Sequence, residues 1–222
     1  MSKSPKYRRS PQAAIATMLA LVAFGACATV AVAAVINGTA APNFLVGTPD
    51  DDTIRGFAGA DTIYGNGQDD FIRGDEGDDR IFGGSADDEI QGNADNDTID
   101  GDGPDITCPF GAPSANYCSS SNGKDGNDEI TGGPGNDIIS GNGDDDDIFG
   151  NLGNDTLNGN DHDDDIDGGA GQDTIRGGAG DDDIEADDNE QDTITCNSGD
   201  DHVNRDPGLD IITDPGACEH LS

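Results

Sequence analysis

The sequence predicts an all-β repeat protein in which short strands alternate with tight turns. Two observations lead to this fold class. An apolar residue recurs every nine residues through most of the chain, and Asp and Gly dominate the segments between these residues. Aspartate and glycine are poor formers of helices and strands and favour turns. Of the 222 residues, 34 are Gly and none is Trp, which counts against a helical bundle and against a conventional aromatic core.

The charge of the chain excludes one large class of partner. Asp and Glu together number 47, Lys and Arg only 10, and the formal net charge is −37. Nucleic-acid binding needs a basic surface, and phosphate groups would repel this chain. We therefore expect no nucleic-acid partner, and we expect cations to be attracted to the chain instead.

Residues 1–34 have the layout of a secretory signal peptide. A basic start precedes an uncharged stretch over 13–34, and Ala31-Val32-Ala33 suits a cleavage site. Cleavage near Ala33 or Ala34 would yield a secreted mature chain without a membrane span. Two alternatives stay open: a retained membrane anchor, since the uncharged stretch is long enough to span a bilayer, and lipid attachment at Cys27.

Fourteen copies of a nine-residue pattern follow in two blocks. In every copy an Ile or Leu stands two residues after an Asp, or after Asn43 in the first copy, and seven residues after a Gly. The consensus is G-[GN]-x-G-x-D-x-I-x, numbered here as positions 1 to 9. We place the first block in residues 35–100 and the second in 123–194, with an insert over 101–122 between them and a C-terminal cap over 195–222.

The copies at 132–140, 168–176 and 177–185 closely resemble the nonapeptide G-G-x-G-x-D-x-U-x of the RTX, or haemolysin-type, calcium-binding repeat family, where U is apolar. The resemblance implies a parallel β-roll, which is a β-solenoid. The first six residues of each copy form a turn, the last three form a short strand, and two copies complete one coil. The residue types agree, because glycine at positions 1, 2 and 4 permits positive φ and one apolar side chain can face a narrow interior.

The resemblance also implies that the position-6 carboxylates bind Ca²⁺ between turns stacked eighteen residues apart. Ca²⁺ takes six to eight oxygen ligands, and pairing the turns on each edge gives about ten ions. Mg²⁺ stays possible, although it demands octahedral geometry. An EF-hand is disfavoured because Thr174 stands where a bidentate Glu is needed. The expected metal ligands are Asp52, Asp61, Asp70, Asp79, Asp88, Asp97, Asp128, Asp137, Asp146, Asp155, Asp164, Asp173 and Asp182.

Four cysteines lie outside the first 34 residues, and we expect them to form disulfides in an exported chain. The simplest pairing closes a loop in the insert with Cys108 and Cys118 and fastens the cap with Cys196 and Cys218, although four cysteines allow three pairings. The cap is expected because a solenoid end exposes its interior and an unpaired strand edge. After residue 185 the D-x-U pairs continue, but their phase slips by one residue.

We expect no enzyme. The chain contains neither a G-x-S-x-G elbow nor an S-x-x-K motif, and each pair of aspartates is a repeated unit rather than a unique site. Two functional hypotheses remain. The first is a secreted calcium-binding β-roll protein that folds on binding the ion outside the cell. The alternative is a calcium-dependent adhesin, or a surface or matrix recognition protein, that uses the 101–122 loop or the outer faces of the roll.

Overall fold

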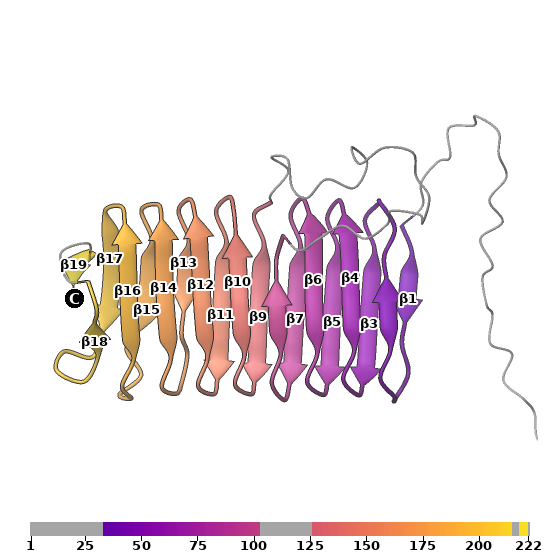
Figure 1. Cartoon of the computed structure of the whole chain (residues 1–222), viewed down its shortest axis with the longest axis horizontal. Helices are drawn as coiled ribbons and strands as arrows, with labels where there is room; N and C mark the ends of the chain where they lie inside the picture. The colour runs from indigo at the N-terminus through magenta and orange to yellow at the C-terminus, as the bar shows by residue number, and fades with distance from the viewer. Residues whose placement is uncertain (1–32, 103–125, 215–217, 222) are drawn as a thin grey trace, which may run out of the picture. The chain divides into compact units, whose positions relative to one another are not determined.

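The structure, a computed structural model, describes residues 33–102, 126–214 and 218–221, and these residues form a parallel β-solenoid without a helix (Figure 1). The strands are β1 (Val35–Asn37), β2 (Phe44–Val46), β3 (Thr53–Ala58), β4 (Thr62–Gly67), β5 (Phe71–Glu76), β6 (Arg80–Ser85), β7 (Glu89–Ala94), β8 (Thr98–Asp100), β9 (Glu129–Pro134), β10 (Ile138–Asn142), β11 (Asp147–Leu152), β12 (Thr156–Asp161), β13 (Asp165–Asp167), β14 (Thr174–Ala179), β15 (Asp183–Ala186), β16 (Thr193–Ser198), β17 (Asp201–Arg205), β18 (Ile211–Ile212) and β19 (Cys218–Leu221).

The strands alternate between two sheets as the chain winds. The ten odd-numbered strands form one sheet in chain order, and the nine even-numbered strands form the other. Every strand pairs in parallel with the strand two further along, so that Ile54 lies beside Ile72 and Ile63 beside Ile81. Two nonapeptides therefore make one coil of eighteen residues, and the predicted parallel β-roll is confirmed.

A single file of aliphatic side chains from each sheet fills the interior. The apolar residue of each repeat is at most 9 % exposed, whereas its neighbours at positions 7 and 9 face outward and, apart from Phe82, are at least partly exposed. Burial of one β-branched residue per strand suits a stacked pleated sheet. The core residues are Leu45, Ile54, Ile63, Ile72, Ile81, Ile90, Ile99, Ile130, Ile139, Ile148, Leu157, Ile166, Ile175, Ile184, Ile194 and Val203.

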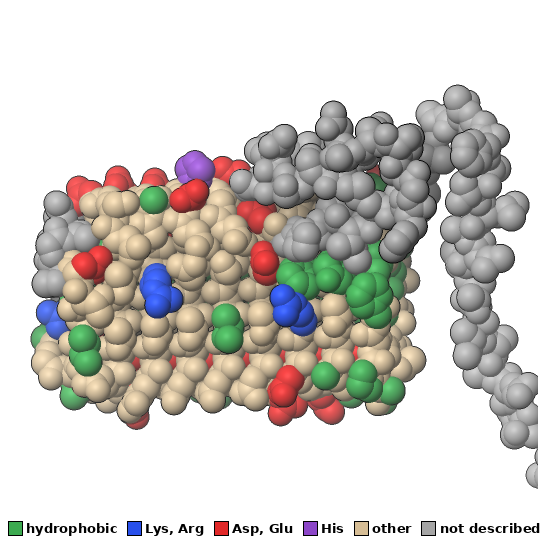
Figure 2. All heavy atoms as spheres, in the orientation of Figure 1, with side chains coloured by type: hydrophobic (Ala, Val, Ile, Leu, Met, Phe, Trp, Pro, Cys, Tyr) green, Lys and Arg blue, Asp and Glu red, His purple; other side chains and the backbone are tan. Residues whose placement is uncertain are grey.

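The outer face of the even-numbered sheet carries an aromatic cluster at its N-terminal end. The rings of Phe44 and Tyr64 lie 5.6 Å apart, and those of Tyr64 and Phe82 stack at 4.7 Å. Figure 2 shows hydrophobic side chains gathered over this end, near β2, β4 and β6. Since each ring belongs to a different coil, the cluster adds contacts between successive coils outside the narrow core.

The insert leaves the stack unbroken. Strand β7 pairs with β9, and β8 with β10, so that Ile90 lies beside Ile130 and Ile99 beside Ile139. The separation between stacked aspartates rises there from 18 to 40 residues, which accommodates the insert in one turn. Cys108 and Cys118 lie outside the described residues, as do residues 1–32, so the Cys108–Cys118 pairing and the signal peptide stay predictions. Among the described residues, no helix is long and apolar enough to cross a membrane.

The glycines of the turns serve two different purposes. Positive φ occurs at position 2, as at Asn66 (91°), and at position 4, as at Gly77 (119°). The expectation of positive φ at position 1 is wrong. Glycines there, such as Gly65, keep ordinary φ values, and they are required because the next coil approaches too closely for a Cβ.

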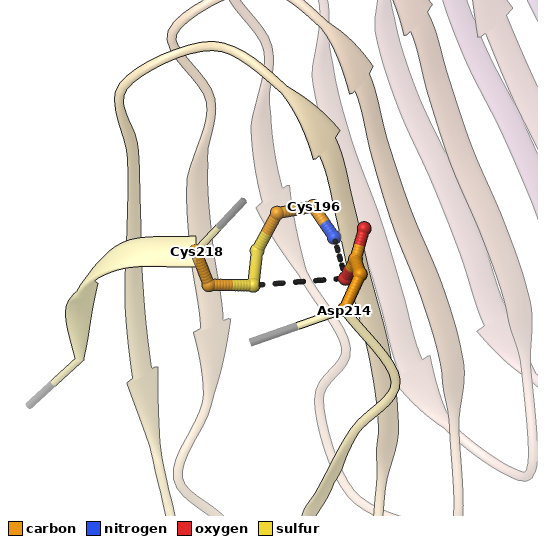
Figure 3. A group of neighbouring side chains, drawn as sticks. All are labelled: Cys196, Asp214 and Cys218. Atoms are coloured by element: carbon orange, nitrogen blue, oxygen red, sulfur yellow. Dashed lines mark hydrogen bonds between the residues drawn. A yellow bond between two sulfur atoms is a disulfide. The ribbon is translucent and has the colours of Figure 1, made fainter. Parts of the chain in front are cut away.

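The predicted cap disulfide joins Cys196 in β16 to Cys218 in β19, with Cα atoms 5.4 Å apart (Figure 3). Asp214 completes this end of the solenoid. Its carboxylate accepts hydrogen bonds from the main-chain N–H groups of Cys196 at 3.1 Å and Asn197 at 2.9 Å. In earlier coils, the position-1 N–H donates to a main-chain carbonyl of the next coil, as Gly47 does to Tyr64. At Cys196 a side-chain carboxylate of the next coil thus takes the place of that main-chain carbonyl.

Candidate metal centre

The position-6 aspartates form two rows, one along each line of stacked turns. All thirteen predicted ligands lie in these rows, and none is more than 4 % exposed. The row preceding the odd-numbered strands, here called the odd row, contains Asp52, Asp70, Asp88, Asp128, Asp146, Asp164, Asp182 and Asp201. The row preceding the even-numbered strands, the even row, contains Asp61, Asp79, Asp97, Asp137, Asp155, Asp173 and Asp192.

Asp192 and Asp201 belong to the rows, but the sequence analysis did not count them as ligands. They are 1 % and 0 % exposed, like the repeats before them. The signal that could have found them was present, since each stands two residues before an aliphatic core residue, Ile194 or Val203. Both pairs are visible in the sequence, but the one-residue slip and the loss of most glycines left their aspartates out of the predicted ligands.

One oxygen of each carboxylate is used to join successive coils. The main-chain N–H of Asp70 donates to Oδ1 of Asp88 at 2.8 Å, and the N–H of Asp146 donates to Oδ1 of Asp164 at 3.0 Å. The same bond crosses the insert, from the N–H of Asp88 to Oδ1 of Asp128 at 2.7 Å. The pairs expected eighteen residues apart are therefore brought side by side, at the spacing of neighbouring strands.

The second oxygen has no partner in most turns. In the described residues, the following Oδ2 atoms are buried without a hydrogen bond: those of Asp61, Asp70, Asp79, Asp88, Asp97, Asp128, Asp137, Asp146, Asp155, Asp164, Asp182 and Asp201. Asp52, in the first complete coil, differs because its Oδ2 accepts the main-chain N–H of Thr48. A buried carboxylate oxygen without a donor is costly, so each of these atoms calls for a cation or a proton.

Most of these unpartnered oxygens face a small space that a main-chain carbonyl oxygen of the next coil also lines, although no such carbonyl is among the nearest atoms beside Asp146. A Cβ on Gly65 would overlap both Oδ2 of Asp70, in the same turn, and the carbonyl oxygen of Gly83, in the next coil. Gly92 has the same surroundings, with Oδ2 of Asp97 and the carbonyl oxygen of Gly132 beside it. We call this space, at position 1 of a turn, the cradle. Glycine keeps the cradle open, and a carboxylate and a carbonyl converge on it.

Burial raises the pKa of most row members, and the charges of neighbouring aspartates raise many of these pKa values further. The hydrogen bond from a main-chain N–H to the carboxylate acts in the opposite direction and lowers the pKa. The pKa reaches about 9 for Asp128 and Asp146, and about 8 for Asp88 and Asp97. It reaches about 7 for Asp70, Asp79, Asp164 and Asp173, and about 6 for Asp137, Asp182 and Asp192. The rows hold negative charge at neutral pH only at a considerable free-energy cost.

The donor set fits a hard divalent cation. Carboxylate and main-chain carbonyl oxygens are the ligands that Ca²⁺ takes, and the cradles offer only these. Position-5 aspartates such as Asp78 and Asp163 lie exposed on the outside of the turns and add to the negative field. One other group in the described ranges, Cys196, Asp214 and Cys218, has the proximity of a metal site, but its sulfurs form the disulfide and offer no thiolate.

A parallel β-solenoid with carboxylates stacked in its turns defines a class of repeat protein suited to hard cations. The model of the RTX calcium-binding nonapeptide repeat matches this chain in four copies, over residues 37–72, 73–103, 122–157 and 158–190. The chain belongs to this family, whose repeats bind Ca²⁺. No curated protein matches the chain. The matches end at residue 190, before Asp192 and Asp201.

Proposed function

We propose that this chain is a secreted, non-catalytic calcium-binding β-roll protein whose folding is driven by Ca²⁺ held between stacked turns. The observation that carries the proposal is the series of buried Oδ2 atoms without hydrogen-bond partners, most of which face a carbonyl oxygen of the next coil. Two oxygens from different coils bound to one ion would fasten those coils together.

The charges of the two rows support ion-coupled folding. Each row stacks carboxylates at strand spacing, and like charges so placed repel each other. The interior contributes one aliphatic residue per nine, worth about 1.5–3 kcal/mol each, against a backbone ordering cost of about 1–2 kcal/mol per residue. A cation in each cradle removes the repulsion and adds a favourable term that the unfolded chain lacks.

Two features support secretion: the layout of residues 1–34 and the disulfide in the cap. Extracellular calcium modules bind in the range of about 10⁻⁴–10⁻³ M, so such a chain would stay unfolded in calcium-poor cytosol and order outside the cell. An oxidising environment is also where disulfides form and persist.

Calcium titration followed by far-UV circular dichroism tests the proposal directly. We expect the full chain in excess chelator at neutral pH to give a coil spectrum, and millimolar CaCl₂ to convert it cooperatively to a β spectrum. MgCl₂ at the same concentration is the control, because Mg²⁺ resists dehydration and should leave the coil spectrum unchanged. A β spectrum already present in chelator at neutral pH would contradict calcium-driven folding.

Substitution of two glycines in one turn tests the cradle. In Gly65→Ala the new Cβ overlaps Oδ2 of Asp70 and the carbonyl of Gly83, so we expect a higher calcium midpoint and a loss of about 1–3 kcal/mol in the free energy of unfolding. In the matched control, Gly67→Ala, the Cβ meets only Oγ of Ser85 at 3.4 Å, and the change should stay within about 0.5 kcal/mol. Equal calcium midpoints for the two variants would show that no ion occupies the cradle.

A further inference from the structure

The two rows of aspartates end differently after residue 185, where the nine-residue repeat gains one residue. Asp183 lies beside His202, nineteen residues on, so one coil has gained a residue. The extra residue lies in the even-row turn, 186–192, which has seven residues in place of six. The following odd-row turn, Cys196–Asp201, keeps six residues, with Cys196 at position 1, Gly199 at position 4 and Asp201 at position 6.

The odd row keeps its cradle across this junction. A Cβ on Gly177 would overlap Oδ2 of Asp182 and lie 3.1 Å from the carbonyl oxygen of Cys196. Asp182 is 1 % exposed, and its Oδ2 has no hydrogen-bond partner. The main-chain N–H of Asp182 donates to Oδ1 of Asp201 at 3.0 Å, which holds the two turns in the usual stack. A buried, unpartnered carboxylate oxygen thus faces a carbonyl that belongs to the cap.

The neighbouring turn of the even row, which carries Asp173, has no such cradle. A Cβ on Gly168 would meet Oδ2 of Asp173 at 2.9 Å and Cδ1 of Ile175 at 3.0 Å, and no carbonyl of the next coil is among its nearest atoms. Ala186 takes position 1 of the following turn and is 2 % exposed. Within the described ranges, neither Asp173 nor Asp192 has a buried oxygen left unpartnered. Asp201 also has a buried, unpartnered Oδ2, but Cys196 rather than glycine stands at position 1 of its turn. Within the described residues, the cradle between Asp182 and Cys196 is therefore the last one with a position-1 glycine on the odd row, and the last one on the even row lies one coil earlier.

We infer that Asp182 and the main-chain carbonyl of Cys196 form a terminal calcium position, and that calcium binding there is coupled to the Cys196–Cys218 disulfide. The inference rests on the proposed function, since it assumes that cradles bind Ca²⁺. The family match ends at residue 190, so half of this position lies outside the recognised repeats.

The coupling follows from the place of Cys196 in the cap. Its side chain is tied to Cys218, and its N–H is held by Asp214 (Figure 3). These two bonds restrain the residue whose carbonyl oxygen lies beside Gly177 and Oδ2 of Asp182. Reduction of the disulfide would leave β19 held by its pairing with β17 alone and would remove one of the two restraints on Cys196. By linkage, an ion that binds better to the oxidised cap must make the disulfide harder to reduce by the same factor.

The first test measures disulfide reduction in the full chain with Cys27, Cys108 and Cys118 changed to Ser, so that only the cap pair remains. Dithiothreitol supplies two electrons and two protons, yields two cap thiols and is itself oxidised to its cyclic disulfide. We expect saturating CaCl₂ to lower the equilibrium constant of this reduction at least about tenfold relative to MgCl₂. Asp182→Asn should abolish the protection, because it keeps the Oδ1 acceptor but removes the charged ligand.

The matched control is Asp192→Asn. Asp192 is equally buried and accepts the main-chain N–H of Asp173 at 2.7 Å, but it lines no cradle. We expect this variant to keep the calcium protection of the wild type. Protection that survives in Asp182→Asn would overturn the inference, as would its loss in both variants. Circular dichroism in calcium verifies that the remaining coils of each variant stay folded.

The second test counts ions by equilibrium dialysis. We expect Asp182→Asn and Cys218→Ser each to bind one Ca²⁺ fewer than the wild type, and the double variant to lose no more than either single variant. Additive losses would mean that the disulfide and Asp182 act on different sites. Absence of calcium binding to the wild type would instead refute the proposed function, so the two failures are distinguishable.

Discussion

In excess chelator, lowering the pH from about 9 to about 4 is expected to convert the chain from coil to β structure without any metal. In the folded state, burial raises the pKa of the row carboxyl groups from 3.8 to about 6 in Asp137, about 8 in Asp88 and about 9 in Asp128. In the unfolded chain they titrate near their ordinary value of about 3.9. The folded state therefore binds more protons across this range.

The sign of the effect follows from linkage. Where the folded state binds more protons, stability falls as the pH rises, so the contribution is complete below the unfolded pKa near 4 and is lost through the folded pKa values of about 6 to about 9. Each pKa unit corresponds to about 1.4 kcal/mol, and most members of both rows shift in the same direction. A few of these groups together already match the whole stability of a domain, about 5–15 kcal/mol.

Far-UV circular dichroism at constant ionic strength measures this transition, and sedimentation at the acidic end checks that the β signal comes from monomers. The calcium-saturated protein is the control. It should be folded at neutral pH and should lose bound calcium as the pH falls, because protons compete for the same carboxylates. A coil spectrum that persists at about pH 4 in chelator would show that the unpartnered Oδ2 atoms do not limit the apo fold.

Most of the fold could be predicted because one short pattern fixes it. The nine-residue phase of Ile, Asp and Gly places one side chain inside, one carboxylate in the turn and one glycine beside it, and this holds from Leu45 to Ile184. Stacking of alternate copies then sets the pairing at eighteen residues, as Ile54 beside Ile72 shows. The repeat alone was therefore enough to predict which strands pair and which side chains are buried.

What escaped prediction depends on contacts between coils. The role of position-1 glycine could not be read from propensity, because it arises from Oδ2 and a carbonyl that meet only after stacking. Asp201 was missed because a copy lengthened by one residue breaks the phase, although the solenoid absorbs the extra residue in a turn. Asp214 was missed as a cap because it lies outside any repeat and its side chain acts in place of a main-chain carbonyl.

Replacing Ile139 by Ala is expected to lower the free energy of unfolding by about 2–5 kcal/mol in saturating calcium. Ile139 is 1 % exposed and lies between Ile99 and Leu157 in the file of the even-numbered sheet. The interior holds one aliphatic side chain per repeat, and the strands on either side are fixed by their own hydrogen bonds. Neighbours cannot move in to fill the space, so most of the cavity cost remains.

Its neighbour in β10 is the matched control. Ile138 is 55 % exposed on the outer face, so Ile138→Ala should change the free energy of unfolding by no more than about 0.5 kcal/mol. Urea unfolding of both variants at one calcium concentration measures the difference, and equal losses would contradict a core built from the inward file alone. Since a solenoid is stabilised by contacts between neighbouring repeats, we further expect Ile139→Ala to weaken the junction between the two blocks. A second unfolding step, separating residues before the insert from those after it, would then appear in this variant and not in Ile138→Ala.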